Sequence, residues 1–191
     1  MDRFPAIPAD KRNEAQQKVV DSLSSGPRGG VRGPFPALLY SPELAKHVEN
    51  LGEHLRFRSV LPKSLAEMAI LITARQWTAQ FEWYAHAKHA LNAGLDPAIV
   101  EAIAKGERPA KMSPAETVVY EFCTELHKTS RLGDATFAKA VETFDRNGTI
   151  ELITLTGYYT MVSMILNVAE VPLPAGEPVP LAPLPRSGSP Q

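Results

Sequence analysis

The sequence predicts an all-α protein, and three observations support this fold class. Apolar residues at helical spacing follow recognisable helix starts, such as Ser41-Pro42, and Ser113-Pro114 with Glu116 completing a capping box. Several of these segments end at a glycine, the residue that most readily adopts the left-handed conformation after a helix. No segment alternates apolar and polar residues as a half-buried strand does. We therefore expect helices near residues 11–24, 42–59, 63–77, 79–93, 97–105, 114–130, 135–147 and 150–168.

Each predicted helix has its own boundary signals. The first follows Asp10 and is broken by the stretch "SSGPRGGVRGPF" at residues 24–35. The helix at 97–105 starts after Asp96, and glycines follow three segments as predicted stops: Gly94, Gly106 and Gly148. Asp134 and Thr149 are the predicted caps of the last two helices.

The amino-acid composition of the chain limits the classes of protein to which it can belong. With 191 residues, of which 44% are hydrophobic, the chain is long enough for one globular domain with its own core. The net charge of -1 comes from interspersed signs, so neither nucleic acid nor an anionic membrane is an expected partner. The only cysteine, Cys123, excludes an internal disulfide and a multi-cysteine metal cluster. The charged start of the chain is unlike a signal peptide, so we expect a cytoplasmic protein.

Two stretches near the C-terminus raise separate questions. Residues 152–169 are apolar enough to suggest a membrane span, but threonine, serine and asparagine interrupt them, so a buried helix of a soluble protein is the better interpretation. We expect the helical domain to cover residues 1–170. Residues 171–191 are rich in proline and form a tail that is expected to be extended or disordered. Such a tail either wraps a neighbouring subunit or hangs loose.

The stretch "QFEWYAHAKH" at residues 80–89 contains the most distinctive chemistry. Glu82 and His86 are four residues apart and so lie on one helical face. Three interpretations are open: a surface ion pair, a metal site that also uses His89, or an acid-base pair. No second ligand motif accompanies these residues, so no metal or other cofactor is predicted.

Residues 30–108 resemble the carboxymuconolactone decarboxylase and AhpD-like superfamily. The resemblance rests on "GPFPALLYSPELA", "LAEMAILITARQW" and "EWYAHAKHALNAGLD", with Glu67, Ala79, Glu82 and His86 at fixed offsets. It implies a multi-helix bundle that forms homo-oligomers, with a polar site between helices.

The chain departs from the peroxidase branch of that superfamily. Ala79 and Glu82 stand where that branch has two cysteines, and thiol-disulfide exchange needs both thiols. Peroxidase activity is therefore not expected. The resemblance to the decarboxylase branch implies a lyase of aromatic compound catabolism that removes CO2 from a small carboxylated lactone. His86 and Glu67 are the candidates for proton transfer, with Glu82 orienting His86.

Further residues are assigned as substrate contacts: Arg32, Phe35, Trp83 and His89. Arg28 and Arg32 can clamp a carboxylate, although a flexible connector is the simpler interpretation of their loop. Glu67 has a simpler interpretation as a first-turn helix residue. The Cys123–His127 pair at helical spacing is interpreted as a buried thiol beside a histidine, not as a nucleophile and its base.

Two alternative functions remain open. One is a cofactor-free isomerase, dehydratase or lyase that uses the same proton shuttle, and the other is a non-catalytic oligomeric binding protein. The stretches that start at Leu65 and Thr149 also resemble each other, with Glu67 aligned on Glu151. This similarity indicates either two related helical halves or only the general likeness of buried helices.

Overall fold

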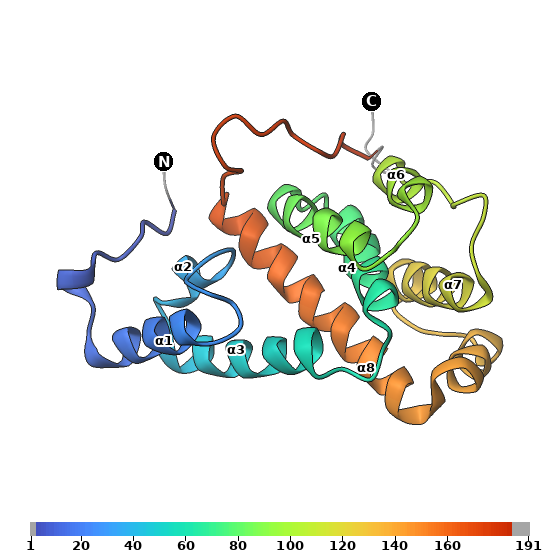
Figure 1. Ribbon diagram of the computed structural model, residues 1–191, viewed down its shortest axis with the longest axis horizontal. Helices are drawn as coiled ribbons and strands as arrows, with labels where there is room; N and C mark the ends of the chain where they lie inside the picture. The colour runs from blue at the N-terminus through green and yellow to red at the C-terminus, as the bar shows by residue number, and fades with distance from the viewer. Residues whose placement is uncertain (1–2, 185–191) are drawn as a thin grey trace.

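The all-α fold class is confirmed by a computed structural model, which describes residues 3–184 and contains no strand within them (Figure 1). A short 3-10 helix at Ala9–Lys11 precedes the α-helices. These are α1 (Glu14–Ser25), α2 (Phe35–Leu38), α3 (Pro42–Phe57), α4 (Lys63–Trp77), α5 (Gln80–Asn92), α6 (Pro97–Lys105), α7 (Pro114–Thr129) and α8 (Asp134–Ala169).

Helix α4 forms the centre of the bundle. It packs against α5, α6, α7 and α8, and every residue from Leu65 to Arg75 is buried. A helix that is apolar around its whole circumference has to be enclosed in this way. Glu67 is one of the few charged residues in this stretch, so it must find its partner inside the protein.

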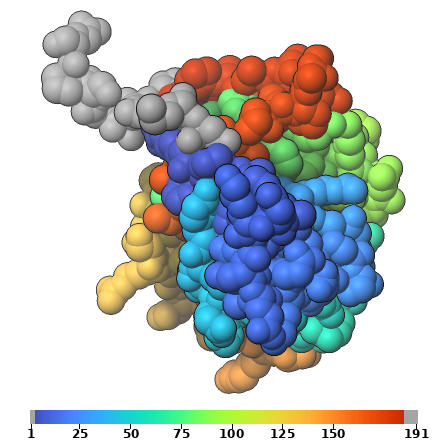
Figure 2. All heavy atoms as spheres, turned by 90° about the vertical axis from the view of Figure 1, so that its left-hand side faces the viewer, coloured from blue at the N-terminus to red at the C-terminus, as the bar shows by residue number. Residues whose placement is uncertain are grey.

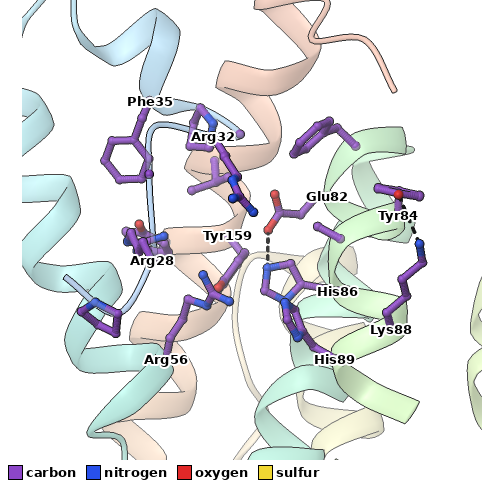
Figure 3. Close-up of a pocket in the computed structure, with 18 of the residues that line it drawn as sticks. Arg28, Arg32, Phe35, Arg56, Glu82, Tyr84, His86, Lys88, His89 and Tyr159 are labelled. Carbon is purple, nitrogen blue, oxygen red and sulfur yellow. Dashed lines mark hydrogen bonds and ion pairs between the residues drawn. The ribbon is translucent and has the colours of Figure 1, made fainter. Parts of the chain in front are cut away.

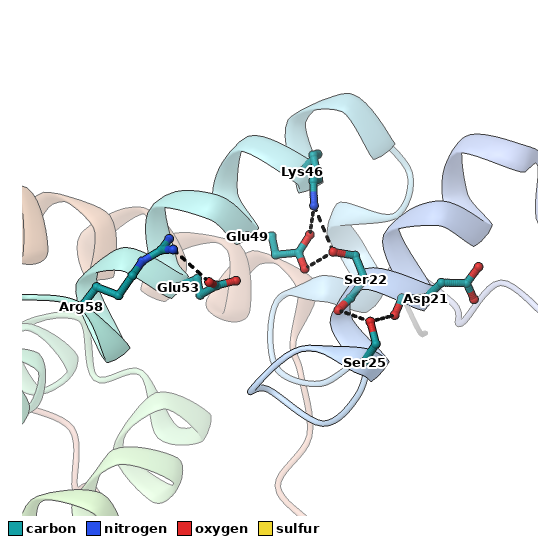
Figure 4. Close-up of polar contacts among 7 residues, drawn as sticks. All are labelled: Asp21, Ser22, Ser25, Lys46, Glu49, Glu53 and Arg58. Carbon is teal, nitrogen blue, oxygen red and sulfur yellow. Dashed lines mark hydrogen bonds and ion pairs between the residues drawn. The ribbon is translucent and has the colours of Figure 1, made fainter.

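The N-terminal helices form a second layer against the bundle. In Figure 2, α1 and α3 cover the face turned to the viewer, and the two helices pack against each other. The buried carboxylate of Glu49 joins them, because it accepts hydrogen bonds from Ser22 Oγ at 2.7 Å and from Lys46 Nζ at 3.2 Å (Figure 4). This contact fixes the position of α3, which carries Arg56, a residue of the site described below.

Some predicted boundaries are confirmed and others shift. Asp96 accepts a hydrogen bond from the backbone of Ala98, and Ser113 and Glu116 form the predicted capping box. Gly94 and Gly106 have the expected positive φ. Asp10 does not cap α1. Asn13 caps it instead, in a capping box with Gln16.

The predicted break between the last two helices is present, but it falls at Asp145 and not at Gly148. The helices expected at 135–147 and 150–168 are both parts of α8, which bends at Asp145, where φ is 55° and ψ is -173°. Asp145 Oδ1 accepts hydrogen bonds from the backbone of Asn147 and Gly148, so it caps the second part. Neither Asp134 nor Thr149 acts as a cap. Gly148 lies buried within α8, where an added Cβ would come within 2.8 Å of Phe144 Cβ, so packing requires a glycine there.

Three other details differ from prediction. The short helix α2 was not expected, because four residues after a proline leave no periodic pattern. The Ser41 side chain does not cap α3. The aligned stretches also differ in form, because a left-handed Thr78 separates α4 from α5, whereas α8 continues unbroken from Thr149 to Ala169.

The C-terminal segment lies against the bundle. Residues 171–184 contain neither helix nor strand, and Leu181 is buried. Gln80 holds this segment through two hydrogen bonds, one to the backbone carbonyl of Leu181 and one from its N–H. Residues 185–191 of the predicted tail lie outside the described residues.

Within residues 3–184, one helix, α8, is long and apolar enough to cross a membrane by length and composition alone. Half of its most apolar window is buried inside the protein, where it packs on α4 and α7. The core helix of a soluble protein has the same length and composition, so this helix is weak evidence for a membrane span.

Candidate active site

Several parts of the chain meet at the candidate site, and one of them is α3, which contributes Arg56 (Figure 3). Helix α5 provides Glu82 and His86, and α4 provides Glu67 behind them. Helix α8 contributes Tyr159, and the loop before α2 contributes arginines opposite α5. The site therefore lies between helices that are far apart in the sequence.

His86 is held by a carboxylate on each ring nitrogen. Its Nδ1 lies 2.7 Å from Glu67 Oε2, and its Nε2 lies 3.0 Å from Glu82 Oε1. All three side chains are buried. With both ring nitrogens protonated, the imidazolium donates one hydrogen bond to each carboxylate, so the charge is compensated without water.

Opposing effects set the protonation state of His86. Burial lowers the pKa of the His86 imidazole, but the negative charge of Glu82 and the hydrogen bonds to both carboxylates outweigh it and raise the pKa to about 9. Burial also raises the pKa of Glu67, but the hydrogen bond and charge of His86 dominate and leave that pKa below its usual value. At neutral pH, His86 is therefore a charged acid with a proton to give.

His86 and Glu82 line a cavity of about 590 Å³. The cavity wall is rich in cations: Arg28, Arg32, Arg56 and Lys88. The guanidinium of Arg28 lies 5.0 Å from the ring centre of Phe35, and its buried Nε and Nη2 have no hydrogen-bond partner among the described residues. In the part of the chain that the structure describes, Arg28, Arg32 and Arg56 form no ion pair with a carboxylate.

The contact between His86 and Glu67 of the preceding helix joins the two residues that the sequence resemblance implied, and Glu82, at a position where the peroxidase branch has a cysteine, adds the second carboxylate. Residues 42–125 match the carboxymuconolactone decarboxylase family. The match confirms the predicted resemblance over a range from the start of α3 into α7, and it includes Glu67, Glu82 and His86. No curated protein sequence matches the chain.

The segment matched to the carboxymuconolactone decarboxylase family supplies only part of the site. Arg28, Arg32, Phe35 and Tyr159 lie outside residues 42–125, yet all four line the cavity. The family segment therefore provides the Glu67–His86–Glu82 group, and the flanking parts of the chain provide most of the facing wall.

The structure brings most of the assigned residues together. Arg32, Phe35, Glu82, His86 and His89 line the cavity, whereas Glu67 does not and contacts His86 from behind. Trp83 also does not line it, because it follows Glu82 by one helical position and is buried in the hydrophobic core.

The cavity residues that were missed in the sequence include Arg56 and Tyr159. Arg56 lies near the end of α3, and its sequence context predicts only a surface arginine. Tyr159 lies in a long apolar stretch that predicts only a buried helix. Only the packing of α8 against α5, and of α3 against α8, brings them to this cavity, so no local signal identifies them.

The geometry bears on the surface ion pair, the metal site and the Cys123–His127 pair that the sequence raised. Glu82 and His86 are buried, which does not fit a surface ion pair. Within residues 3–184, no group of three histidine, cysteine, aspartate or glutamate side chains is arranged to hold a metal ion. Cys123 lies 3.6 Å from Thr156 and His127 lies 3.0 Å from Thr73, so these two residues have separate partners.

Proposed function

We propose that this protein is a cofactor-independent lyase that protonates carbon during the decarboxylation of a small carboxylated, lactone-like compound. The observation that supports this most directly is a charged, buried His86 held between two carboxylates at the wall of a cationic cavity. The family match supports the same class of chemistry.

The cavity wall favours an anionic substrate. Arg28, Arg32 and Arg56 lack carboxylate partners among residues 3–184, so their charge is available to a ligand. Guanidinium groups bind carboxylates through paired, charge-assisted hydrogen bonds. A cavity of about 590 Å³ also suits a small molecule.

Glu67, His86 and Glu82 together form what we call the acid group, and the geometry suggests a distinct role for each of them. Glu67 holds Nδ1 from the side away from the cavity, so it orients His86 and stabilises its charge. Glu82 lies on Nε2 and lines the cavity. A proton therefore leaves His86 at Nε2, either through Glu82 or directly when that hydrogen bond opens. This assignment gives Glu67 the orienting role that the sequence had suggested for Glu82.

In the proposed step, the bond between the substrate carbon and its carboxylate breaks, CO2 leaves, and the electron pair of that bond is delocalised as an enolate. The carbon then accepts the proton from Nε2 of His86, and the acid group recovers a proton from solvent. Nearby arginines compensate the negative charge that remains on the substrate.

The test is a screen of carboxylated lactones and related unsaturated acids with the full chain in D2O. A true substrate should release CO2 and acquire deuterium at the carbon that lost the carboxylate, as detected by NMR. His86→Gln should lower turnover by roughly 10² or more, the usual scale of general acid catalysis. The matched control is His47→Gln, which changes an exposed histidine of α3 outside the cavity.

Several outcomes would contradict the proposal. Full activity in His86→Gln would show that the histidine is not the acid. Release of CO2 without deuterium at carbon would exclude protonation by this site. Failure of every compound to react, combined with tight binding of one of them, would favour the non-catalytic binding protein.

A further inference from the structure

Tyr159 is a buried tyrosine beside His86, and its hydroxyl has no hydrogen-bond partner among the described residues. Its ring packs edge-on against His86, with 5.0 Å between the ring centres, and against Tyr158 at 5.2 Å. Only 2% of the residue is exposed, and it lines the cavity. Rings on both sides hold this side chain in one position.

The Tyr159 hydroxyl makes no hydrogen bond to any residue from 3 to 184, and it is not one of the fully enclosed unpaired polar atoms, so it is open to the cavity. A buried tyrosine hydroxyl normally has a partner, because an unpaired polar group inside a protein is costly. The neighbouring Tyr158 follows this rule and donates a hydrogen bond to the Val48 carbonyl at 3.1 Å. The contrast leaves the Tyr159 hydroxyl, which is open to the cavity, available to an acceptor there.

The surroundings of Tyr159 fix the character of that ligand atom. In Figure 3 its side chain extends from α8 toward the guanidinium of Arg56. Burial and the nearby negative charge of Glu82 raise the pKa of the phenol well above its usual value, so the hydroxyl keeps its proton at neutral pH and can donate a hydrogen bond to an acceptor. A neutral donor beside a cation is suited to an oxygen that carries negative charge.

We propose that Tyr159 and Arg56 form an oxyanion site that stabilises the enolate oxygen of the substrate while His86 protonates its carbon. This inference rests on the proposed function and adds a catalytic residue to it. When CO2 leaves, the electron pair shifts toward the carbonyl oxygen. Tyr159 donates a hydrogen bond to that oxygen without transferring its proton, and Arg56 compensates the charge. Protonation of carbon by the acid group then returns the oxygen to a carbonyl.

The two parts of the site come from different helices. His86 and Glu82 are on α5, whereas Tyr159 is on α8 and Arg56 is on α3. A flat enolate can therefore receive a proton at carbon from one side and a hydrogen bond at oxygen from another. Only the closed bundle provides both, because three separate helices contribute.

The first measurement needs no substrate and uses 4-nitrophenolate, a flat oxyanion whose binding changes its absorbance. The wild-type protein should bind the phenolate, and Tyr159→Phe should weaken this binding roughly tenfold or more. Tyr120→Phe is the matched control, because it removes a tyrosine hydroxyl on α7, outside the cavity. 4-Nitroanisole, which has no ionisable oxygen, should bind the wild type and Tyr159→Phe alike.

The second measurement uses any substrate found in the screen. Tyr159→Phe should lower kcat by roughly 10² with little change in KM, because the hydrogen bond strengthens only as charge develops. Its thermal stability should be unchanged or slightly higher, since the lost hydroxyl has no hydrogen-bond partner within residues 3–184.

The outcomes separate this inference from the proposed function. Equal phenolate affinity in wild type and Tyr159→Phe, or no phenolate binding at all, would overturn the oxyanion site. His86-dependent turnover that is unaffected in Tyr159→Phe would also overturn it while leaving the proposed function standing. Phenolate binding that depends on Tyr159, without turnover of any compound, would keep the oxyanion site and remove the lyase.

Discussion

Glu67 Oε2 lies 2.7 Å from Nδ1 of His86, although the two residues are 19 positions apart and belong to different helices. If this contact supports the charged imidazole, Glu67→Gln should lower the His86 pKa from about 9, because the variant keeps a hydrogen-bond acceptor but loses the negative charge. NMR titration of the histidine ring protons measures this directly. Glu43→Gln, which changes an exposed glutamate of α3, is the control. An unchanged His86 titration would show that Glu67 does not tune the ring.

The raised pKa of His86 also predicts how stability varies with pH. The folded protein holds this proton up to about pH 9, whereas the unfolded chain releases it near 6.5. The stabilisation is therefore fully present below about pH 6.5 and is lost as pH rises through about 9. Urea unfolding between pH 6 and 10 should show this decline. His86→Gln should remove that part of the pH dependence, and His47→Gln should keep it. A wild-type free energy of unfolding that stays constant over this range would contradict the prediction.

The kinetics of a Glu82 variant distinguish a proton relay through this residue from a contact that only orients His86. If protons pass from His86 Nε2 through Glu82, Glu82→Gln should lower turnover by roughly 10², about as much as His86→Gln. The double variant should then be little worse than either single one, because the two residues act as a unit. If Glu82 only orients the ring, Glu82→Gln should retain most of the activity. Steady-state kinetics of the three variants decides between these roles.

Cys123 should take no part in the chemistry. Burial raises the pKa of its thiol to about 12, so almost no thiolate exists at neutral pH. Cys123→Ser should leave turnover nearly unchanged but lower stability by about 1–3 kcal/mol, because a more polar hydroxyl replaces a buried thiol. The native protein should also resist alkylation by iodoacetamide until it is unfolded. Rapid alkylation of the native protein would contradict this assignment. Loss of turnover in a Cys123→Ser variant that is fully folded would contradict it as well.

An apolar stripe on α8 supports the predicted homo-oligomer. Ile150, Ile153, Met164 and Val168 are exposed at helical spacing on one face of this helix. Contiguous exposed apolar surface of this kind marks an interaction site. Light scattering at micromolar concentration should therefore report an oligomer, and Met164→Lys with Val168→Lys should shift it toward monomer. Leu91→Lys, which changes an isolated exposed leucine of α5, should leave the mass unchanged. A wild-type monomer would contradict the prediction.

The sequence by itself determined the fold class and the Glu82–His86 pair on α5. Glycine stops, capping residues and apolar periodicity are local signals, so most helices lie where they were predicted. Glu82 and His86 could be paired from their spacing, because helical geometry alone brings them together. Their burial was only suggested by the apolar residues around them.

Local signals failed where packing decides the backbone. Gly148 looks like a helix stop, but the tight contact with Phe144 explains it better, and the bend falls at Asp145 instead. The side chain of Trp83 looked like a cavity wall, but the rotation of α5 turns it into the core. A sequence does not reveal how far a helix is rotated against its neighbours when several of its faces are apolar.

Only the tertiary structure decided what surrounds His86. Glu67 reaches Nδ1 because α4 packs on α5, and Tyr159 and Arg56 reach the cavity because α8 and α3 pack nearby. These residues are separated by long stretches of chain, so no spacing rule relates them. The His86 pKa of about 9 has the same origin, since it depends on burial and on carboxylates that two helices bring to the same ring.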